Sequence, residues 1–228
     1  MNNSLAVTTM IRNRLINENH SLSDKMTFFH EKGVTMLMDG NYIFLKTDRR
    51  GHISELSDIC NGLIYRDKYL LCFHGKETKT MSLSEARENF IWNSNTVLMD
   101  YFPDGVVNYL FWDYVAENWQ VSDEKQPISP YSIIIKEQVY NIMALDPRYT
   151  YELSLVQTGD EAGLYLMGAY DNRSLKELPW NKVDPIAGRH KLLRPTLYAF
   201  TKFDDIEENE LPLLVQDQSL SKIIINAL

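Results

Sequence analysis

The sequence of 228 residues has few cysteines and no long apolar run. Its two cysteines, Cys60 and Cys72, are too few for a disulfide scaffold, and we expect reduced thiols in a cytoplasmic compartment. The apolar runs at 69–73 and 223–225 fall far short of the roughly 20 residues that a membrane-spanning helix needs. Residues 1–4 are not a basic region followed by an apolar stretch, so no secretory signal is expected. These absences predict a soluble globular protein without a membrane partner.

The motifs of several common enzyme classes are missing as well. The five histidines are scattered and no Cys-x-x-Cys pair is present, which argues against a zinc site. The sequence has no Gly-x-Ser-x-Gly and no Gly-x-Gly-x-x-Gly, and Gly75-Lys76 lacks the earlier glycine that a P-loop requires. Serine hydrolases, dinucleotide enzymes and P-loop nucleotidases are therefore disfavoured, and we expect neither a metal nor a cofactor.

Basic side chains are also fewer than acidic ones, 23 against 31. A net charge of -8 argues against a nucleic-acid partner, because phosphate binding normally leaves a basic footprint. The imbalance is local, however, since the segment 203–218 holds six acidic side chains and neither lysine nor arginine. Basic groups remain at Lys46, Arg49 and Arg50 and in the window 173–194, so the sequence does not exclude a basic surface.

The apolar pattern predicts a β-rich chain with a few helices and no internal repeat. We expect helices at 4–19, from Ser21 onward, at 82–90 and at 131–142, and a hairpin around Asp39-Gly40. Further strands are expected at 62–65, 69–73, 96–101, 106–112, 119–122, 150–156 and 163–170. This pattern predicts an α+β fold of antiparallel β-sheets with flanking helices in a single domain, 1–228. Its parts are a helical N-terminal part (about 1–32), a mixed β-rich core (about 33–202) and an acidic C-terminal segment (203–228).

Aromatic residues are concentrated in one segment, where seven of the nineteen residues from Tyr101 to Trp119 are aromatic. On a strand, Tyr109 points to one face and Trp112 to the other. Exposed rings beside cations hold single-stranded nucleic acid, because a base stacks on a ring whatever its sequence. The alternative is that both faces are buried in a two-layer fold, and the pattern leaves this open.

Several short motifs follow one another between residues 60 and 170. They are Cys-Asn-Gly-Leu-Ile-Tyr at 60–65, the segment ending at Lys79, Asp-Tyr-Phe-Pro-Asp-Gly-Val-Val at 100–107, Tyr-Glu-Leu at 151–153 and the strand 164–170. In this order they resemble the phage RNA ligases of the T4 RNA ligase 1 type, within the covalent nucleotidyltransferases. The resemblance implies a nucleotidyltransferase core with a degenerate nucleotide pocket at Phe102, Asp104, Gly105 and Glu152.

The departures from this family fall on its chemistry. Those ligases attack ATP with the lysine of a Lys-x-Asp-Gly motif, and here Phe102 stands in its place. No lysine of the chain has a glycine three residues later, and the arginine expected before Gly62 is Asn61. Since a phenyl ring is not a nucleophile, the resemblance implies a ligase-like fold that is not an enzyme.

Two functions are expected from these features. The first is a non-catalytic single-stranded nucleic-acid-binding protein, with single-stranded DNA favoured over RNA. The resemblance alone implies a phage accessory factor in transcription or replication, with a phage or host RNA polymerase or a replication protein as partner. The expected binding residues are three aromatic side chains for stacking and five cations for phosphates: Tyr109, Trp112, Trp119, Arg49, Arg50, Arg66, Lys76 and Lys79. The second is a protein-interaction factor, such as an inhibitor of a host enzyme. An active nucleotidyltransferase is a further alternative, and it would need Lys76 or Lys79 as nucleophile.

Overall fold

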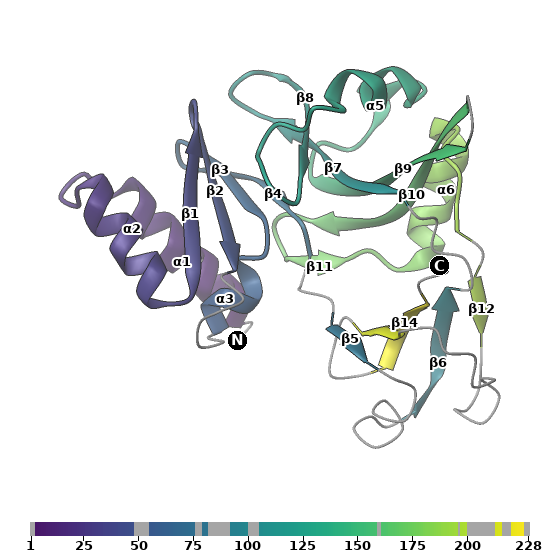
Figure 1. The fold of residues 1–228 in the computed structure, drawn as a ribbon, viewed down its shortest axis with the longest axis horizontal. Helices are drawn as coiled ribbons and strands as arrows, with labels where there is room; N and C mark the ends of the chain where they lie inside the picture. Colours follow the sequence, from purple (N-terminus) through teal and green to yellow (C-terminus); the bar gives the residue numbers. More distant parts are fainter. Residues whose placement is uncertain are drawn as a thin grey trace.

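Three β-sheets with helices beside them make up the computed structural model (Figure 1). The structure describes residues 3–47, 55–75, 79–81, 92–99, 105–158, 161–195, 197–199, 213–215 and 220–225. Strand pairing is antiparallel throughout the described sheets except where β14 (Leu220–Ile225) lies parallel to β6 (Trp92–Met99). The expected α+β class is therefore confirmed, with one parallel pair that the sequence did not predict.

The first sheet belongs to the N-terminal part and has the order β1-β2-β3-β4. The expected second helix begins at Ser21, whose hydroxyl accepts the Asp24 amide at 3.1 Å while the Asp24 carboxylate accepts the Ser21 amide at 3.0 Å. The expected hairpin is present, and Gly40 supplies the left-handed φ of +56° in its turn. Helices and sheet share a core that includes Ile11, Phe29 and Leu45. The elements are α1 (Asn3–Ile16), α2 (Leu22–Glu31), β1 (Val34–Asp39), β2 (Tyr42–Thr47), α3 (Glu55–Ile59), β3 (Leu63–Arg66) and β4 (Tyr69–Phe73).

The second sheet has the order β11-β10-β9-β7-β8, and two helices cover one of its faces (Figure 1). Leu110 and Leu153 of the sheet pack in one core with Ile135 of α5 and Ile186 of α6. Because side chains alternate along a strand, Glu152 lies on the opposite face from this core. The elements are β7 (Val106–Asp113), β8 (Asn118–Asp123), α5 (Ser132–Gln138), a 3-10 turn (Ile142–Ala144), β9 (Tyr149–Thr158), β10 (Glu161–Asp171), β11 (Lys176–Glu177) and α6 (Trp180–His190).

Two helices differ from the sequence expectation. The helix expected at 131–142 ends at Gln138, and Asn141 then adopts a left-handed φ of +51° before the 3-10 turn. Helix α6 was not predicted, because Pro185 lies inside it and Pro179 precedes it. Its buried residues Val183, Ile186, Ala187 and His190 nevertheless follow the helical spacing that marks a core-facing side.

The third sheet has the order β12-β6-β14-β13-β5 and lies below the second sheet in the view of Figure 1. It joins β5 (Lys79–Met81), β6, β12 (Leu197–Ala199), β13 (Leu213–Val215) and β14, which are far apart in the sequence. The helix expected at 82–90 lies outside the described residues, as does the acidic segment 203–218 apart from β13.

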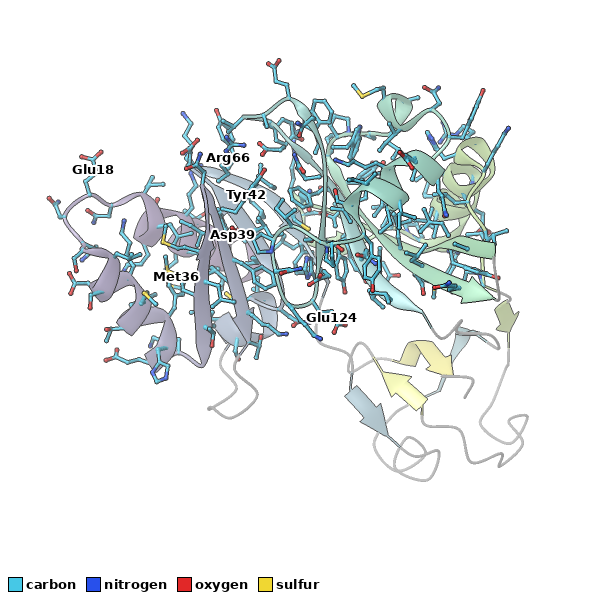
Figure 2. All side chains as sticks on the ribbon, turned by 45° about the horizontal axis from the view of Figure 1, so that its top comes forward. Glu18, Met36, Asp39, Tyr42, Arg66 and Glu124 are labelled. Atoms are coloured by element: carbon cyan, nitrogen blue, oxygen red, sulfur yellow. The ribbon has the colours of Figure 1, made fainter. Side chains whose placement is uncertain are left out.

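The first two sheets share a small core and are joined at both of its ends. Phe44, Ile64 and Leu71 of the first sheet pack with Tyr109 and Phe111 of the second. At one end, Tyr42 and Arg66 contact the carboxylate of Asp113, and at the other the Lys46 ammonium donates to the Glu124 carbonyl at 2.7 Å. Figure 2 labels Tyr42 and Arg66 at the first end and Glu124 at the second. The relative position of β4 and β7 is therefore fixed by apolar packing and by polar contacts.

Both cysteines are free and buried, as expected for reduced thiols, and burial raises the pKa of the Cys72 thiol to about 12. No helix among the residues that the structure describes is long and apolar enough to cross a membrane.

Candidate functional site

A buried polar cluster lies where the first and second sheets meet. His74, directly after β4, stacks on Tyr109 of β7 with ring centroids 3.6 Å apart and planes 7° from parallel. His74 Nε2 lies 2.9 Å from the Ser122 hydroxyl of β8, so the imidazole is fixed at its edge as well as on its face. This stack therefore connects the end of β4 in the first sheet with the middle of β7 in the second sheet.

Two glycines allow the chain to pack closely against these rings. Gly62 has a φ of +82°, and a Cβ there would lie 2.0 Å from His74 Nδ1. Gly75 has a φ of +83°, and a Cβ there would lie 2.7 Å from the ring of Tyr170. Both positions require glycine, because each combines a left-handed backbone with a ring in contact.

Glu152 of β9 is the carboxylate of the cluster. It lies opposite Tyr109 in the pairing of β7 with β9, and its Oε2 accepts the Tyr170 hydroxyl at 2.7 Å. Gly168 lies opposite Glu152 on the other side, where a Cβ would come within 3.5 Å of Glu152 Oε2 and 3.3 Å of Glu177 Oε1. The chain thus places two carboxylates and a tyrosine hydroxyl around one glycine.

Gly105 lies farther along the same face of β9. A Cβ at Gly105 would be 2.5 Å from the Ser154 hydroxyl and 2.7 Å from the Leu155 carbonyl, so this position also excludes a side chain. Ser154 follows Glu152 by two residues, which puts both on one face of the strand. The Ser154 hydroxyl is buried and has no hydrogen-bond partner among the described residues.

Burial sets the charge state of the two stacked rings. Burial, with a smaller contribution from the Lys46 ammonium, lowers the pKa of His74 to about 3, so the imidazole is neutral at physiological pH. Burial and the nearby Glu152 carboxylate raise the pKa of Tyr109 well above its usual value. These groups can stack on a ring or accept hydrogen bonds, and none of them is an amine nucleophile. No three His, Cys, Asp or Glu side chains within the described ranges lie close enough to hold a metal ion.

Two residues of the expected pocket, Gly105 and Glu152, lie among the described residues and along one face of β9. Gly62 contacts His74, His74 stacks on Tyr109, and Tyr109 lies opposite Glu152, with Gly105 along the same face. Five predicted site residues lie outside the described residues: Arg49, Arg50, Lys76, Phe102 and Asp104. Lys79 begins β5 and pairs with Val215 of β13.

The prediction of an aromatic stacking surface is wrong for two of its three residues. Tyr109 is 6% exposed beneath His74, and Trp119 is 4% exposed in the core under α5, so neither ring has a free face. Trp112 is half-buried against Trp119, with ring centroids 5.4 Å apart. Tyr109 and Trp119 therefore join sheets and helices, since each ring is covered by a neighbouring element.

Arg66 also differs from its predicted role as a phosphate contact. Its guanidinium lies 2.6 Å from Oδ2 of Asp113, a carboxylate that is fully buried. An arginine that compensates a buried carboxylate is part of the structure, because withdrawing it would leave that charge unpaired.

Two residues of the cluster were given no role from the sequence, His74 and Tyr170. The position of Tyr170 could have been predicted from the sequence, because it follows Gly168 by two residues and so lies on the same face of the strand. For His74 the sequence holds no such signal, since its stacking partner lies 35 residues later and in another sheet.

The three-sheet arrangement is a ligase-like fold, as a comparison with solved structures shows. Structures of an archaeal ATP-dependent RNA ligase are similar: form 1 aligns over 96% of this chain with a TM-score of 0.62, and form 2 over 96% with 0.60. A protein assigned as an ATP-dependent DNA ligase from Aquifex aeolicus aligns over 90% with a TM-score of 0.62. All three are 12% identical to this chain, so the likeness concerns the fold alone.

The chain spans a little under two thirds of these structures, 63%, 64% and 62% of their lengths in the order given. No family model and no curated protein matches the sequence.

Proposed function

We propose that this protein is a non-catalytic, single-strand-preferring nucleic-acid-binding protein built on a ligase-like fold. Single-stranded DNA is the favoured ligand, and the role is that of a phage accessory factor in transcription or replication. The proposal is carried by the ligase-like fold together with the sequence resemblance, which puts Phe102 where those ligases have their lysine. The phage origin and the partner, a viral or host polymerase or replication protein, come from the sequence resemblance alone.

The absence of ligase chemistry is supported by what fills the site. Next to Gly62, the position of the family's arginine-glycine strand, lies the neutral His74 ring stacked on Tyr109. A ligase of this kind forms a lysyl-nucleotide, which requires an amine at the position of Phe102. Incubation with α-labelled ATP and a divalent cation, followed by a denaturing gel, should leave no label on the protein. Label that survives denaturation, and is lost in a Lys76→Ala or Lys79→Ala variant, would establish an active transferase instead.

Nucleic-acid binding is tested by the salt dependence of affinity. Fluorescence anisotropy with labelled single-stranded DNA, single-stranded RNA and duplex DNA should give submicromolar, salt-sensitive binding that is tightest for single-stranded DNA. The double variant Arg49→Ala with Arg50→Ala should flatten the plot of log affinity for single-stranded DNA against log salt by about 1.4. A matched control is Lys182→Ala with Arg189→Ala, which removes two charges from α6 and should leave the slope unchanged. An unaltered slope in the Arg49 and Arg50 variant would remove these residues from the interface.

A second candidate function, protein interaction, is favoured by an exposed apolar group around α5. Ile133 is 69% exposed, Met143 68%, Tyr140 55% and Ile134 45%. Exposed apolar side chains gathered in one short segment are typical of protein contact sites. Absence of binding to any nucleic acid at low salt would make this the better candidate.

A further inference from the structure

A second surface of the molecule combines exposed tyrosines with cations, away from the cluster around Glu152. It is formed by the turn between β3 and β4, the turn after β7, the loop before β9 and the turn after β10. We call it the tyrosine surface, and its residues are Lys68, Tyr69, Tyr114, Arg148, Tyr149 and Arg173.

Two of its rings are exposed and lie side by side. Tyr69 is 44% exposed and Tyr114 is 42% exposed, in contrast to the buried Tyr109. Their ring centroids are 6.4 Å apart with planes tilted by 38°. The Tyr114 hydroxyl donates to the Pro147 carbonyl at 2.7 Å, which holds this ring in place from the neighbouring loop. A base that stacks on these rings therefore meets side chains that are already oriented.

Cations surround the two rings. The Lys68 ammonium lies 5.5 Å from the ring centroid of Tyr69, and Arg173 is close enough to Tyr114 to influence its hydroxyl. Neither cation forms an ion pair with another residue of the described chain. Arg148, 5.3 Å from the Tyr149 ring, is paired with Asp146.

Acidic side chains lie in the same turns as well, at Asp67, Glu117, Asp146 and Asp171. Asp146 accepts hydrogen bonds from Arg148 at 2.6 to 3.1 Å, and the two charges compensate each other. Asp171 accepts the backbone amides of Arg173 at 2.7 Å and Ser174 at 3.3 Å, which satisfies one oxygen within its own turn but leaves its charge in place. The surface therefore carries mixed charge, and its affinity for a single strand rests on the two rings, with Lys68 and Arg173 as the cations beside them.

The tyrosine surface is independent of the degenerate nucleotide pocket. Gly62 precedes β3 and His74 follows β4, whereas Lys68 and Tyr69 lie at the other end of both strands. Likewise Gly105 precedes β7 and Tyr114 follows it. Because Glu152 lies opposite Tyr109, five residues before Tyr114, the tyrosine surface is separated from Glu152 by roughly 17 Å along β7.

We propose that the tyrosine surface binds single-stranded nucleic acid, with bases stacked on Tyr69 and Tyr114 and flanking phosphates at Lys68 and Arg173. Exposed rings bordered by unpaired cations suit a ligand that alternates flat bases with anionic phosphates. The assignment rests on the proposed function and specifies where on the molecule it takes place.

The test is fluorescence anisotropy with a labelled 15-nucleotide oligothymidine, using the full chain. The double variant Tyr69→Ala with Tyr114→Ala should bind about thirtyfold more weakly, since each stacked base is worth at least about fivefold in Kd. The variant Tyr69→Phe with Tyr114→Phe keeps both rings and should bind within about threefold of the wild type. Lys68→Ala with Arg173→Ala should lower the salt slope by about 1.4, as expected for two phosphates of a single strand.

Tyr140→Ala is the matched control, because this ring is 55% exposed and has the Lys191 ammonium 4.4 Å from its centroid, but lies beside α6. It should bind as the wild type does. Thermal unfolding of each variant verifies that the fold is intact. If the alanine variant does not fold, the phenylalanine and cation variants still test the proposal.

The outcomes separate the two proposals. A wild type that binds no single strand at low salt overturns the proposed function together with this surface. A wild type that binds while the alanine variant binds equally well overturns the tyrosine surface alone. Equal losses for the alanine and phenylalanine variants would also overturn it, because the hydroxyls rather than the ring faces would then be responsible.

Discussion

Replacing Asp113 by alanine is expected to destabilise the protein by about 2–3 kcal/mol, because a buried carboxylate and its four hydrogen bonds are lost. The carboxylate is fully buried and its Oδ2 accepts from Arg66 and Tyr42, both at 2.6 Å. Its Oδ1 accepts the backbone amides of Val115 at 2.8 Å and Ala116 at 3.0 Å. The substitution therefore removes four hydrogen bonds and leaves the Arg66 charge without its partner where the two sheets meet.

Two control variants calibrate this effect by chemical denaturation. Tyr42→Phe removes one of the four hydrogen bonds and should cost about 1 kcal/mol. Asp146→Ala breaks the ion pair between Arg148 and Asp146, which has the same length of 2.6 Å. The side chains of this pair are 50% and 35% exposed. This surface pair should be worth less than about 1 kcal/mol, because water screens it. An Asp113→Ala variant no less stable than Asp146→Ala would show that the pair does not join the sheets.

The same carboxylate predicts a loss of stability in acid. Burial alone would raise the pKa of Asp113, but hydrogen bonds from Tyr42, Arg66 and the two amides outweigh it, and the pKa lies below its usual 3.8. Since the folded-state pKa is the lower one, the stabilisation is complete above the unfolded-state pKa and is lost as the pH falls through the folded-state pKa. In Asp113→Asn the unfolding free energy should therefore fall less steeply than in the wild type below about pH 4.

Replacing Gly62 by alanine is expected to cost about 3 kcal/mol or more, from two independent causes. The backbone φ of +82° is unfavourable for any residue with a Cβ, and that Cβ would lie 2.0 Å from the His74 ring. The ring has little room to move, because it is stacked on Tyr109 and contacts Ser122.

Gly40→Ala separates the two causes. Gly40 also has a positive φ, +56°, but nothing lies within 4 Å of the position of its Cβ. Its alanine variant should therefore show only the backbone cost, about 1–2 kcal/mol, in the same denaturation experiment. Adding His74→Ala to the Gly62→Ala variant should destabilise it by less than His74→Ala destabilises the wild type. Equal costs for the two glycine variants would mean that His74 yields without penalty.

Local features were read correctly from the sequence. The hairpin around Gly40 and the helix start at Ser21 were predicted because a turn dipeptide and a capping box act within a few residues. The strands near 63–73, 106–123 and 149–171 were located for the same reason, since alternation is a property of the segment itself. Helix α6 was not predicted, although its buried residues have helical spacing, and prolines such as Pro185 are unusual inside a helix.

The candidate site was predictable only in part. The resemblance to ligase motifs predicted a pocket at Phe102, Asp104, Gly105 and Glu152, of which Gly105 and Glu152 lie among the described residues, along one face of β9. The exposure of individual rings was not predictable, because Tyr109 and Tyr114 are both tyrosines in one aromatic segment. Only the packing of β4 against β7 buries the first and leaves the second 42% exposed.

The sequence by itself determined the α+β class and most strand positions. The tertiary structure decided which rings and charges face solvent, which arginine is held by a buried carboxylate, and how five distant segments assemble into the third sheet. The physical reason is range: propensity and capping act over a few residues, whereas burial and charge pairing depend on partners tens of residues away.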